Sequence, residues 1–268
     1  MDLPKYSKGI TSPIAILVGS VIIAVAILIS GGVIQITPKN ATVAPTPSSA
    51  DGGSRQAPSA ITLTQVKDAF SRAQIKFGDA NRKLIVLEIS DPSCPYCHIA
   101  AGKNPELNRE AGAQFKLVTD GGTYIAPVPE LKKLVDSGQA SLAWIYSVGH
   151  GNGEMGTKAM YCANEKGKFW EVHDLLMTSK GYDLLNNTVK NDKAKSGDVA
   201  NFLAGVFDSS AMKACLDSGK YDNRLQTDVG LAQGLGVSGT PGFFLNATPF
   251  SGAYSFKDME TAVTSALK

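Results

Sequence analysis

Apolar and polar residues follow regular patterns along most of this chain, and these patterns predict its elements. Two short apolar runs rich in β-branched residues predict buried strands at residues 83–90 and 141–147. Apolar residues at helical spacing predict an N-terminal helix over Ile61–Phe77, which Thr62 or Thr64 caps. Later in the chain the patterns predict a helical stretch at 154–234, an edge strand at 249–254 and a closing helix at 256–267, capped by Ser255.

The most apolar stretch of the chain is Ile14–Ile36, and no charged residue occurs between Lys8 and Lys39. At about 1.5 Å per residue this stretch reaches about 35 Å, enough to cross a hydrocarbon core of roughly 30 Å. We therefore expect an uncleaved signal-anchor, a single transmembrane helix over residues 13–36. A cleaved signal peptide is the alternative, but the apolar region of such a peptide is usually only about 7 to 15 residues long.

Two lysines, Lys5 and Lys8, precede this apolar stretch. By the positive-inside rule, residues 1–12 are expected in the cytoplasm and the rest of the chain outside it. Residues 37–60 are rich in Pro, Ala, Ser, Thr and Gly, bury too little apolar surface to fold, and are expected to be a flexible linker. Residues 61–268 would then form one domain, held at the cell membrane in an extracytoplasmic, oxidising compartment.

Composition narrows the class of protein. A chain of 268 residues with 43% hydrophobic content suits one globular domain with an added N-terminal segment. The formal net charge is +2 and no tract rich in Lys or Arg occurs, so nothing favours nucleic-acid binding. The three histidines have no paired spacing, and we expect no metal site.

A Cys-x-x-Cys motif, Cys94–Cys97, follows the first predicted strand after the chain breaker Asp91-Pro92. The motif therefore lies where a strand ends and a helix begins. A cysteine at a helix N-terminus meets unpaired N–H groups and the positive end of the helix dipole, which favour the thiolate. We expect Cys94 to be an exposed nucleophile and Cys97, one turn further along, to be the shielded partner with which it forms a reversible disulfide.

Two other interpretations of this motif have to be weighed. A zinc site would need two further ligands, and the remaining cysteines, Cys162 and Cys215, are isolated from one another in the sequence. A purely structural disulfide between Cys94 and Cys97 would close a loop too small to constrain the unfolded chain much. Redox chemistry is therefore favoured. His98 either stabilises a nearby thiolate as a cation or is a solvated helix residue.

Three separate motifs resemble those of the DsbA-like thiol-disulfide oxidoreductases, in the same order along the chain. They are Glu88-Ile89-Ser90-Asp91-Pro92-Ser93-Cys94-Pro95-Tyr96-Cys97, Gly167-Lys168-Phe169-Trp170-Glu171 and Val237-Ser238-Gly239-Thr240-Pro241. The likeness covers roughly Leu84 to the C-terminus. It implies an α/β thioredoxin fold with a helical domain inserted at about residues 150–234, and an enzyme that needs no cofactor.

The likeness weakens between Lys103 and Gln139, where the chain departs from the compact pattern of that family. Glycines and prolines divide this segment into helical or irregular pieces, and a helix is predicted to resume over Val128–Val135. The segment is either a substrate-facing lip of the active site or a surface addition.

The resemblance also implies roles for individual residues. Glu88 would be a buried acid beneath the active site that assists proton transfer at the second cysteine, with an exposed strand-end carboxylate as the alternative. Pro241 would be a cis proline facing the cysteine pair, and Thr240 would present backbone groups to a β-like substrate segment. Pro95 and Tyr96, between the two cysteines, complete the expected substrate-binding residues.

Cys162 and Cys215 both fall in the predicted helical block. In an oxidising compartment two such cysteines are expected to pair, and some members of the family that this chain resembles carry a second bridge. A structural Cys162–Cys215 disulfide would close a long loop and stabilise the fold by about 4 kcal/mol.

The sequence thus predicts a thiol-disulfide oxidoreductase that introduces disulfides into secreted or membrane proteins through a mixed disulfide at Cys94. From the resemblance, we expect a quinone-linked membrane partner of DsbB-like or vitamin K epoxide reductase-like type to reoxidise it. A reductase or isomerase is the alternative with the same chemistry, because Pro95-Tyr96 also occurs in reducing thioredoxin-fold proteins. A membrane-tethered copper chaperone that uses both cysteines and a histidine is the alternative from another class.

Overall fold

The computed structural model describes residues 60–268, and these belong to one compact unit, Ala57–Lys268. The predicted cytoplasmic segment 1–12, the transmembrane helix 13–36 and all but the last residue of the predicted linker 37–60 lie outside the described residues. Within residues 60–268, none of the helices combines the length and the apolar character needed to cross a bilayer.

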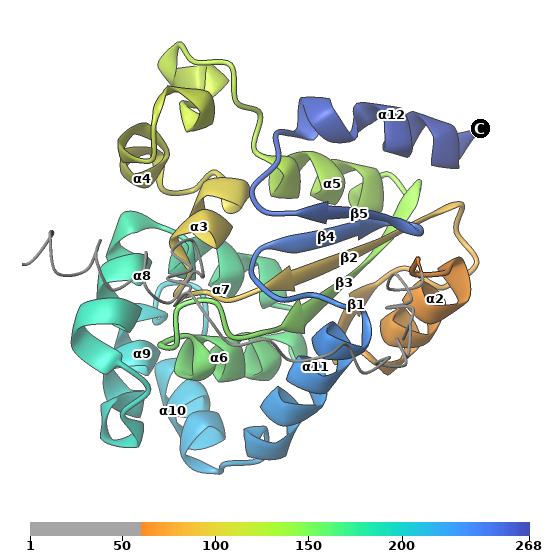
Figure 1. Ribbon diagram of the computed structural model, residues 1–268. Helices are drawn as coiled ribbons and strands as arrows, with labels where there is room; N and C mark the ends of the chain where they lie inside the picture. Colours follow the sequence, from red (N-terminus) through yellow and green to blue (C-terminus); the bar gives the residue numbers. More distant parts are fainter. Residues whose placement is uncertain (1–59) are drawn as a thin grey trace, which may run out of the picture. The chain divides into compact units, whose positions relative to one another are not determined.

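A five-stranded mixed sheet lies at the centre of this unit (Figure 1). The strands are β1 (Ile75–Phe77), β2 (Leu84–Ser90), β3 (Ala140–Tyr146), β4 (Gly242–Leu245) and β5 (Thr248–Ser251), in the spatial order β1-β3-β2-β4-β5. Strands β2 and β3 are parallel, and every other neighbouring pair is antiparallel. Every residue of β2 and β3 is buried, as their apolar runs predict for central strands covered on both faces.

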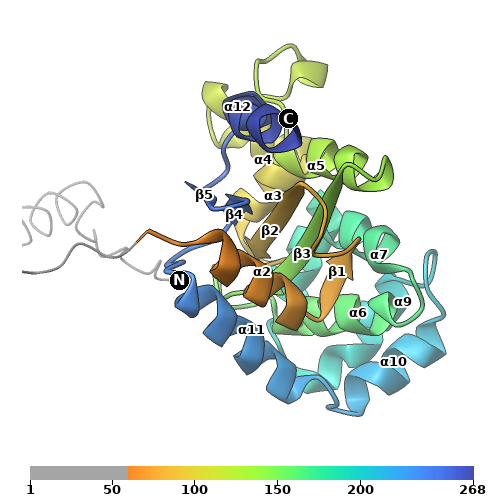
Figure 2. The ribbon, with the colours of Figure 1, turned by 90° about the vertical axis from the view of Figure 1, so that its right-hand side faces the viewer.

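Helices cover both faces of the sheet (Figures 1 and 2). On one face, α2 (Leu63–Arg72) and α11 (Asp222–Gly234) pack against a cluster that includes Ile85, Leu87 and Ile145. The other face carries α3 (Pro95–Ala101), α5 (Pro127–Asp136) and α12 (Phe256–Leu267), which share the larger apolar core. Because side chains alternate along a strand, even-numbered residues of β2 point to this second face.

The chain between β3 and β4 is helical, as the resemblance implies. After β3 come α6 (Glu154–Asn164), α7 (Phe169–Leu176), α8 (Ser179–Asp183), a π-helical turn (Leu184–Val189), a short turn (Lys193–Lys195), α9 (Ser196–Phe202) and α10 (Ser209–Asp217). The predicted inserted domain, about 150–234, extends too far, because α11 returns to pack on the sheet beside α2.

A buried carboxylate joins this helical block to the sheet. Asp228 on α11 accepts the backbone N–H of Tyr146 on β3, 3.2 Å away, and the hydroxyl of Tyr161 on α6, 2.5 Å away. It also pairs with Arg224, one turn earlier on α11. Asp228 is fully buried, so all of its hydrogen bonds are made within the protein.

The first helix is shorter than its pattern predicts. The expected helix over Ile61–Phe77 ends at Arg72, and Ile75–Phe77 instead form the edge strand β1. Ala73 is extended, and Ile75 then pairs with Trp144 of β3. A long-range ladder therefore overrides the local helical spacing, which the sequence alone does not reveal. The predicted cap is present, since Thr62 and Gln65 form a capping box.

The segment that departs from the family pattern consists of short pieces. It contains α4 (Pro105–Glu110), two 3-10 turns (Ala113–Phe115 and Val118–Asp120) and then α5. Figure 1 shows α4 and the chain after it projecting beyond the end of the sheet, next to α3. Helix α5, in contrast, packs on the sheet, so the excursion from the compact fold ends at about residue 126.

Candidate active site

The Cys-x-x-Cys motif lies where β2 gives way to α3, as predicted. Cys94 is the N-cap of α3 in an extended conformation, and Pro95 occupies the first helical position, where a missing N–H costs nothing. The backbone N–H groups of Cys97 and His98 both donate to the Cys94 carbonyl, at 3.1 and 3.2 Å. The first turn of the helix therefore holds the Cys94 sulfur at a fixed place beside Cys97.

Both cysteines are free thiols and both are buried. The prediction that Cys94 is exposed is wrong, because only 4% of this residue is accessible, against 1% of Cys97. Two loops cover it. The Cys94 sulfur lies 3.4 Å from the backbone carbonyl oxygen of Thr240, and the peptide bond between Thr240 and Pro241 is cis. Gly149, in the loop after β3, covers Cys94 on another side.

The surroundings of the two thiols shift their pKa values in opposite directions. A hydrogen bond from the Cys97 thiol lowers the pKa of Cys94 to about 6, with the help of Thr240 and the N–H groups of Tyr96 and Cys97, even though burial acts in the opposite direction. Burial, together with the neighbouring Cys94, raises the pKa of Cys97 well above its ordinary value. At neutral pH, Cys94 is therefore the thiolate and Cys97 the thiol.

Asp91 organises the backbone around Cys94. This fully buried carboxylate accepts the N–H and the hydroxyl of Ser93, both at 2.7 Å, and the N–H groups of Gly149 and His150, at 2.8 and 2.9 Å. The N–H of Asp91 itself donates to the Cys97 sulfur at 3.4 Å. One side chain thus ties the start of α3 to the loop that covers Cys94, a role that the sequence reasoning missed.

Glu88 is the buried acid that the resemblance implies, and the exposed alternative does not hold. It is 1% accessible and points to the same sheet face as Ser90, two residues nearer the cysteine pair. Burial raises the pKa of Glu88 and so favours the protonated carboxyl group.

His98 is neither the cation nor the solvated residue that its position suggested. It is fully buried, with Nδ1 2.9 Å from the Met177 carbonyl and Nε2 2.8 Å from the Pro92 carbonyl. Burial lowers the pKa of His98 to about 4, although both carbonyl contacts act in the opposite direction. Within residues 60–268, no three His, Cys, Asp or Glu side chains are placed to hold a metal ion.

The expected second disulfide is present in the helical block. Cys162 on α6 and Cys215 on α10 are bonded, across a sequence separation of 53. Cys162 is buried in the main core, and Cys215 is partly buried against it. The bridge lies in elements remote from the thiol pair in sequence, and its place in the core is structural.

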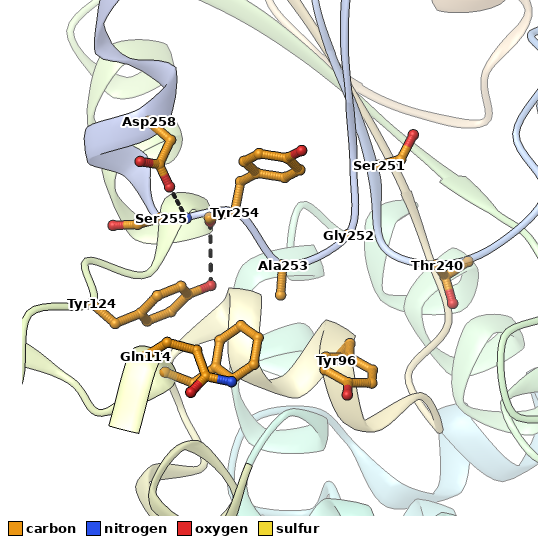
Figure 3. Close-up of a pocket in the computed structure, with 11 residues that line it drawn as sticks. Tyr96, Gln114, Tyr124, Thr240, Ser251, Gly252, Ala253, Tyr254, Ser255 and Asp258 are labelled. Carbon is orange, nitrogen blue, oxygen red and sulfur yellow. Dashed lines mark hydrogen bonds between the residues drawn. The ribbon is translucent and has the colours of Figure 1, made fainter. Parts of the chain in front are cut away.

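A pocket of about 480 Å³ opens beside the motif (Figure 3). Tyr96 of α3 and Thr240 line it on the side of the cysteines, and the chain around Ala253 and Tyr254 forms its far wall. Its remaining wall comes from Gln114, Phe115 and Tyr124 of the 103–126 excursion. The pocket therefore brings Tyr96 and Thr240, both predicted to bind substrate, together with aromatic residues that the sequence reasoning did not single out.

Comparison with known families shows which family the chain belongs to. A family model described as Thioredoxin matches residues 128–265, from α5 to the last helix. The chain belongs to the thioredoxin family. This match begins after the cysteine pair. The structure shows the remaining part of the site, in which the Cys-x-x-Cys motif lies between β2 and α3 and faces a cis proline.

Solved structures of the thioredoxin fold are similar over most of the described residues. BdbD from Bacillus subtilis (oxidised) has a TM-score of 0.53 at 15% identity, covering 72% of this chain and 91% of that one. The catalytic domain of Proteus mirabilis ScsC has a TM-score of 0.52 at 18% identity, covering 77% and 99%. Wolbachia pipientis alpha-DsbA1 gives 0.52 at 16%, covering 72% and 89%. The predicted thioredoxin fold is confirmed.

Two curated proteins match a similar share of this thioredoxin-family chain. They are Na(+)/H(+) antiporter NhaA 3 of Salinispora tropica, 26% identical over 193 residues, and Na(+)/H(+) antiporter NhaA 1 of Salinispora arenicola, 29% identical over 190 residues. Each match covers 70% of this chain but only 24% of the antiporter. The chain thus spans about a quarter of the length of these relatives.

The close approach of Gly149 leads to a prediction. A Cβ atom at this position would lie 1.8 Å from the Thr240 hydroxyl and 3.0 Å from the Cys94 Cβ, so that Gly149→Ala must displace one of the two loops that cover Cys94. We expect thiol exchange to slow by about tenfold to a hundredfold, since a displacement of about 1 Å at a reacting group costs that much. The measurement is the exchange rate with a two-cysteine peptide. Gly239→Ala, in the same loop as Thr240 but with open space at its Cβ, is the matched control and should react normally. Equal rates for both variants would contradict the packing argument.

Proposed function

We propose that this protein works in the oxidising direction, transferring the Cys94–Cys97 disulfide to secreted or membrane proteins outside the cytoplasm. The observation that carries the proposal is the pKa of Cys94, about 6. A thiolate that forms this readily stabilises the dithiol state relative to the disulfide, and a protein whose dithiol state is stabilised is a strong oxidant. The thiolate of the reductase thioredoxin is less stabilised, with a pKa of about 7.

The exchange proceeds through a mixed disulfide. A substrate thiolate attacks the Cys94 sulfur of the closed pair, the Cys94–Cys97 bond breaks, and its electron pair leaves on Cys97, which takes the proton of Glu88. A second substrate thiolate then attacks the substrate sulfur of the mixed disulfide and expels Cys94 as a thiolate. The low pKa of Cys94 makes it a good leaving group in this last step.

The substrate is proposed to lie along Thr240, with one apolar or aromatic side chain in the adjoining pocket. Tyr96, Phe115 and Tyr124 offer rings to that side chain, and Thr240 offers backbone groups to an extended segment. On this proposal, the 103–126 excursion is the substrate-facing lip rather than a surface addition. Pro95 would serve mainly to set the start of α3.

The location and partners of the protein are part of the same proposal. The apolar stretch Ile14–Ile36 would anchor the chain in the cell membrane, with the thiol pair on the outer side. The anchor would hold the protein close to a DsbB-like or vitamin K epoxide reductase-like membrane protein that reoxidises Cys94 and Cys97. Such tethering raises the effective concentration of the two partners without any new contact.

The test is a pair of measurements on the full-length dithiol protein in detergent. The rate of Cys94 alkylation should rise with pH and reach half its maximum near pH 6, because only the thiolate reacts. The equilibrium potential against glutathione should lie nearer to about −120 mV, where strong oxidants lie, than to about −270 mV, where reductants lie. A midpoint at about pH 7 or above together with the lower potential would overturn the oxidase proposal in favour of a reductase.

A further inference from the structure

A backbone N–H group is directed at the sulfur that leaves when the Cys94–Cys97 disulfide opens. The N–H of Asp91 donates to Sγ of Cys97, 3.4 Å away, and Cys97 is only 1% accessible. In the oxidising step the bonding electron pair comes to rest on this sulfur, which is a weak acceptor as a thiol but carries a negative charge as a thiolate. A donor placed here therefore stabilises the opened state more than the closed one.

The peptide unit that carries this N–H is held at its other end. Its carbonyl, that of Ser90, accepts the N–H of Ser147 at 3.1 Å, which continues the β2–β3 pairing beyond the last paired residues of both strands. The carbonyl of Asp91 in turn accepts the N–H of Cys94 at 3.0 Å. These bonds fix the direction of the donor before the reaction begins, and a donor that needs no rearrangement stabilises developing charge most effectively.

The side chain of Asp91 secures the same stretch of backbone. Oδ1 accepts the N–H and the hydroxyl of Ser93, and Oδ2 accepts the N–H groups of Gly149 and His150. Two donors on each oxygen match an ionised carboxyl group, because a protonated one would turn an O–H towards donors. The room for Oδ1 depends on Gly153, where a Cβ atom would lie 1.8 Å away. The carboxylate is therefore fixed between the start of α3 and the loop after β3.

We propose that the Asp91 N–H is the donor that stabilises the Cys97 thiolate during thiol-disulfide exchange, and that the Asp91 carboxylate positions this donor. The inference rests on the thiol-disulfide exchange of the proposed function and holds for either direction of it, since the same sulfur attacks when the pair closes again. The N–H touches a reacting atom, whereas the carboxylate acts only through the backbone that it holds.

The step balances without a further reactant. A substrate thiolate attacks Sγ of Cys94, the Cys94–Cys97 bond breaks, and both bonding electrons stay on Sγ of Cys97. The N–H of Asp91 holds this negative charge by a hydrogen bond until the proton of Glu88 arrives, and it gives up no proton itself. This hydrogen bond acts to lower the pKa of Cys97, against the larger effects of burial and of Cys94.

The charge of Asp91 gives the proposal a testable sign. A carboxylate close to a leaving thiolate repels it, so on electrostatic grounds alone Asp91→Asn should make the step faster. An asparagine side chain, however, turns an NH2 group towards donors that now meet a carboxylate oxygen. The backbone must then shift and carry the N–H away from the sulfur, so that the positioning role predicts a slower step.

The experiment measures how fast dithiothreitol opens the Cys94–Cys97 disulfide in the full-length Asp91→Asn protein, followed by alkylation and mass. We expect this step to slow about tenfold, a modest part of what a preorganised donor contributes to stabilising an oxyanion. Alkylation of Cys94 in the dithiol protein should not slow, because the donor serves the other sulfur. A general loss of structure would not separate the two reactions in this way.

Asn191→Gly is the matched control for loosening the loop after β3. The Asn191 side chain holds this loop through Gly151 and Met155, at 2.9 and 3.2 Å, and its loss leaves the four bonds of the Asp91 carboxylate intact. Glycine suits the positive φ of 60° at this position. The control should open at the wild-type rate.

A second measurement reports on the hydrogen bond itself, in isotope-labelled wild-type protein. The amide proton resonance of Asp91 should move downfield when the disulfide is reduced, because Cys97 then shares the negative charge of the Cys94 thiolate and accepts more strongly. Exchange of this proton with deuterium should slow on reduction for the same reason. In the Asp91→Asn protein both differences at position 91 should shrink.

Two results would overturn the inference. A folded Asp91→Asn variant that opens as fast as the wild type, or faster, would show that the carboxylate acts through its charge and not through placement. An Asp91 amide proton that is the same in both redox states would show that it serves neither sulfur, and this result decides even if the variant does not fold. A wild-type disulfide that dithiothreitol does not open would refute the proposed function instead.

Discussion

Replacement of Cys97 by alanine is expected to abolish turnover and leave the protein locked to its substrates. Loss of the hydrogen bond from Cys97 raises the pKa of Cys94 from about 6, but its thiolate still attacks a disulfide, and no neighbouring thiol remains to release the mixed disulfide. We expect steady-state exchange to fall by at least about a thousandfold. Adducts should accumulate on non-reducing gels, with mass spectrometry placing each bond on Cys94.

The reciprocal variant, Cys94→Ala, serves as the control. Cys97 is buried and burial raises its pKa well above the ordinary value, so it stays a thiol and is covered on every side. The variant should form no adducts, although its fold is intact. Adducts of similar yield at Cys97 would contradict the assignment of Cys94 as the nucleophile, which depends on the difference between the two environments.

Loss of the Cys162–Cys215 bridge is expected to cost about 4 kcal/mol of the free energy of unfolding. The bridge closes a loop across 53 positions and joins α6 to α10, so its removal frees much of the helical block in the unfolded chain. The measurement is urea unfolding of the Cys162→Ala, Cys215→Ala double variant at fixed temperature. A domain stability of about 5–15 kcal/mol leaves little margin after such a loss.

The oxidised Cys94–Cys97 pair provides a matched comparison for this bridge. It closes a far shorter loop, so its removal by Cys94→Ala, Cys97→Ala should change stability much less through the unfolded state. A loss below about 1 kcal/mol for the Cys162–Cys215 variant would contradict the prediction. It would mean that the helices hold each other in place without the covalent bond.

Local signals predicted the parts of the site that depend on near neighbours in the sequence. The break at Asp91-Pro92 placed Cys94 at the start of a helix, and the structure has it as the N-cap of α3. Ser255 caps the last helix through a capping box with Asp258, as its position suggested. These features follow from backbone chemistry within one turn, which a sequence displays directly.

The features that the sequence did not predict depend on distant segments meeting. Cys94 is buried because Thr240, 146 positions away, and Gly149 fold over it, and no local pattern records that contact. Ile75 joins the sheet because β3 offers an open edge to it.

The anchoring of the helical block through Asp228 has a consequence for how the domain can move. Sheet, α6 and α11 meet at this one buried carboxylate, so the block cannot tilt away from the sheet without exposing or unpairing it. The block and the sheet are therefore expected to move as one rigid body, which leaves motion to the loops and the 103–126 excursion.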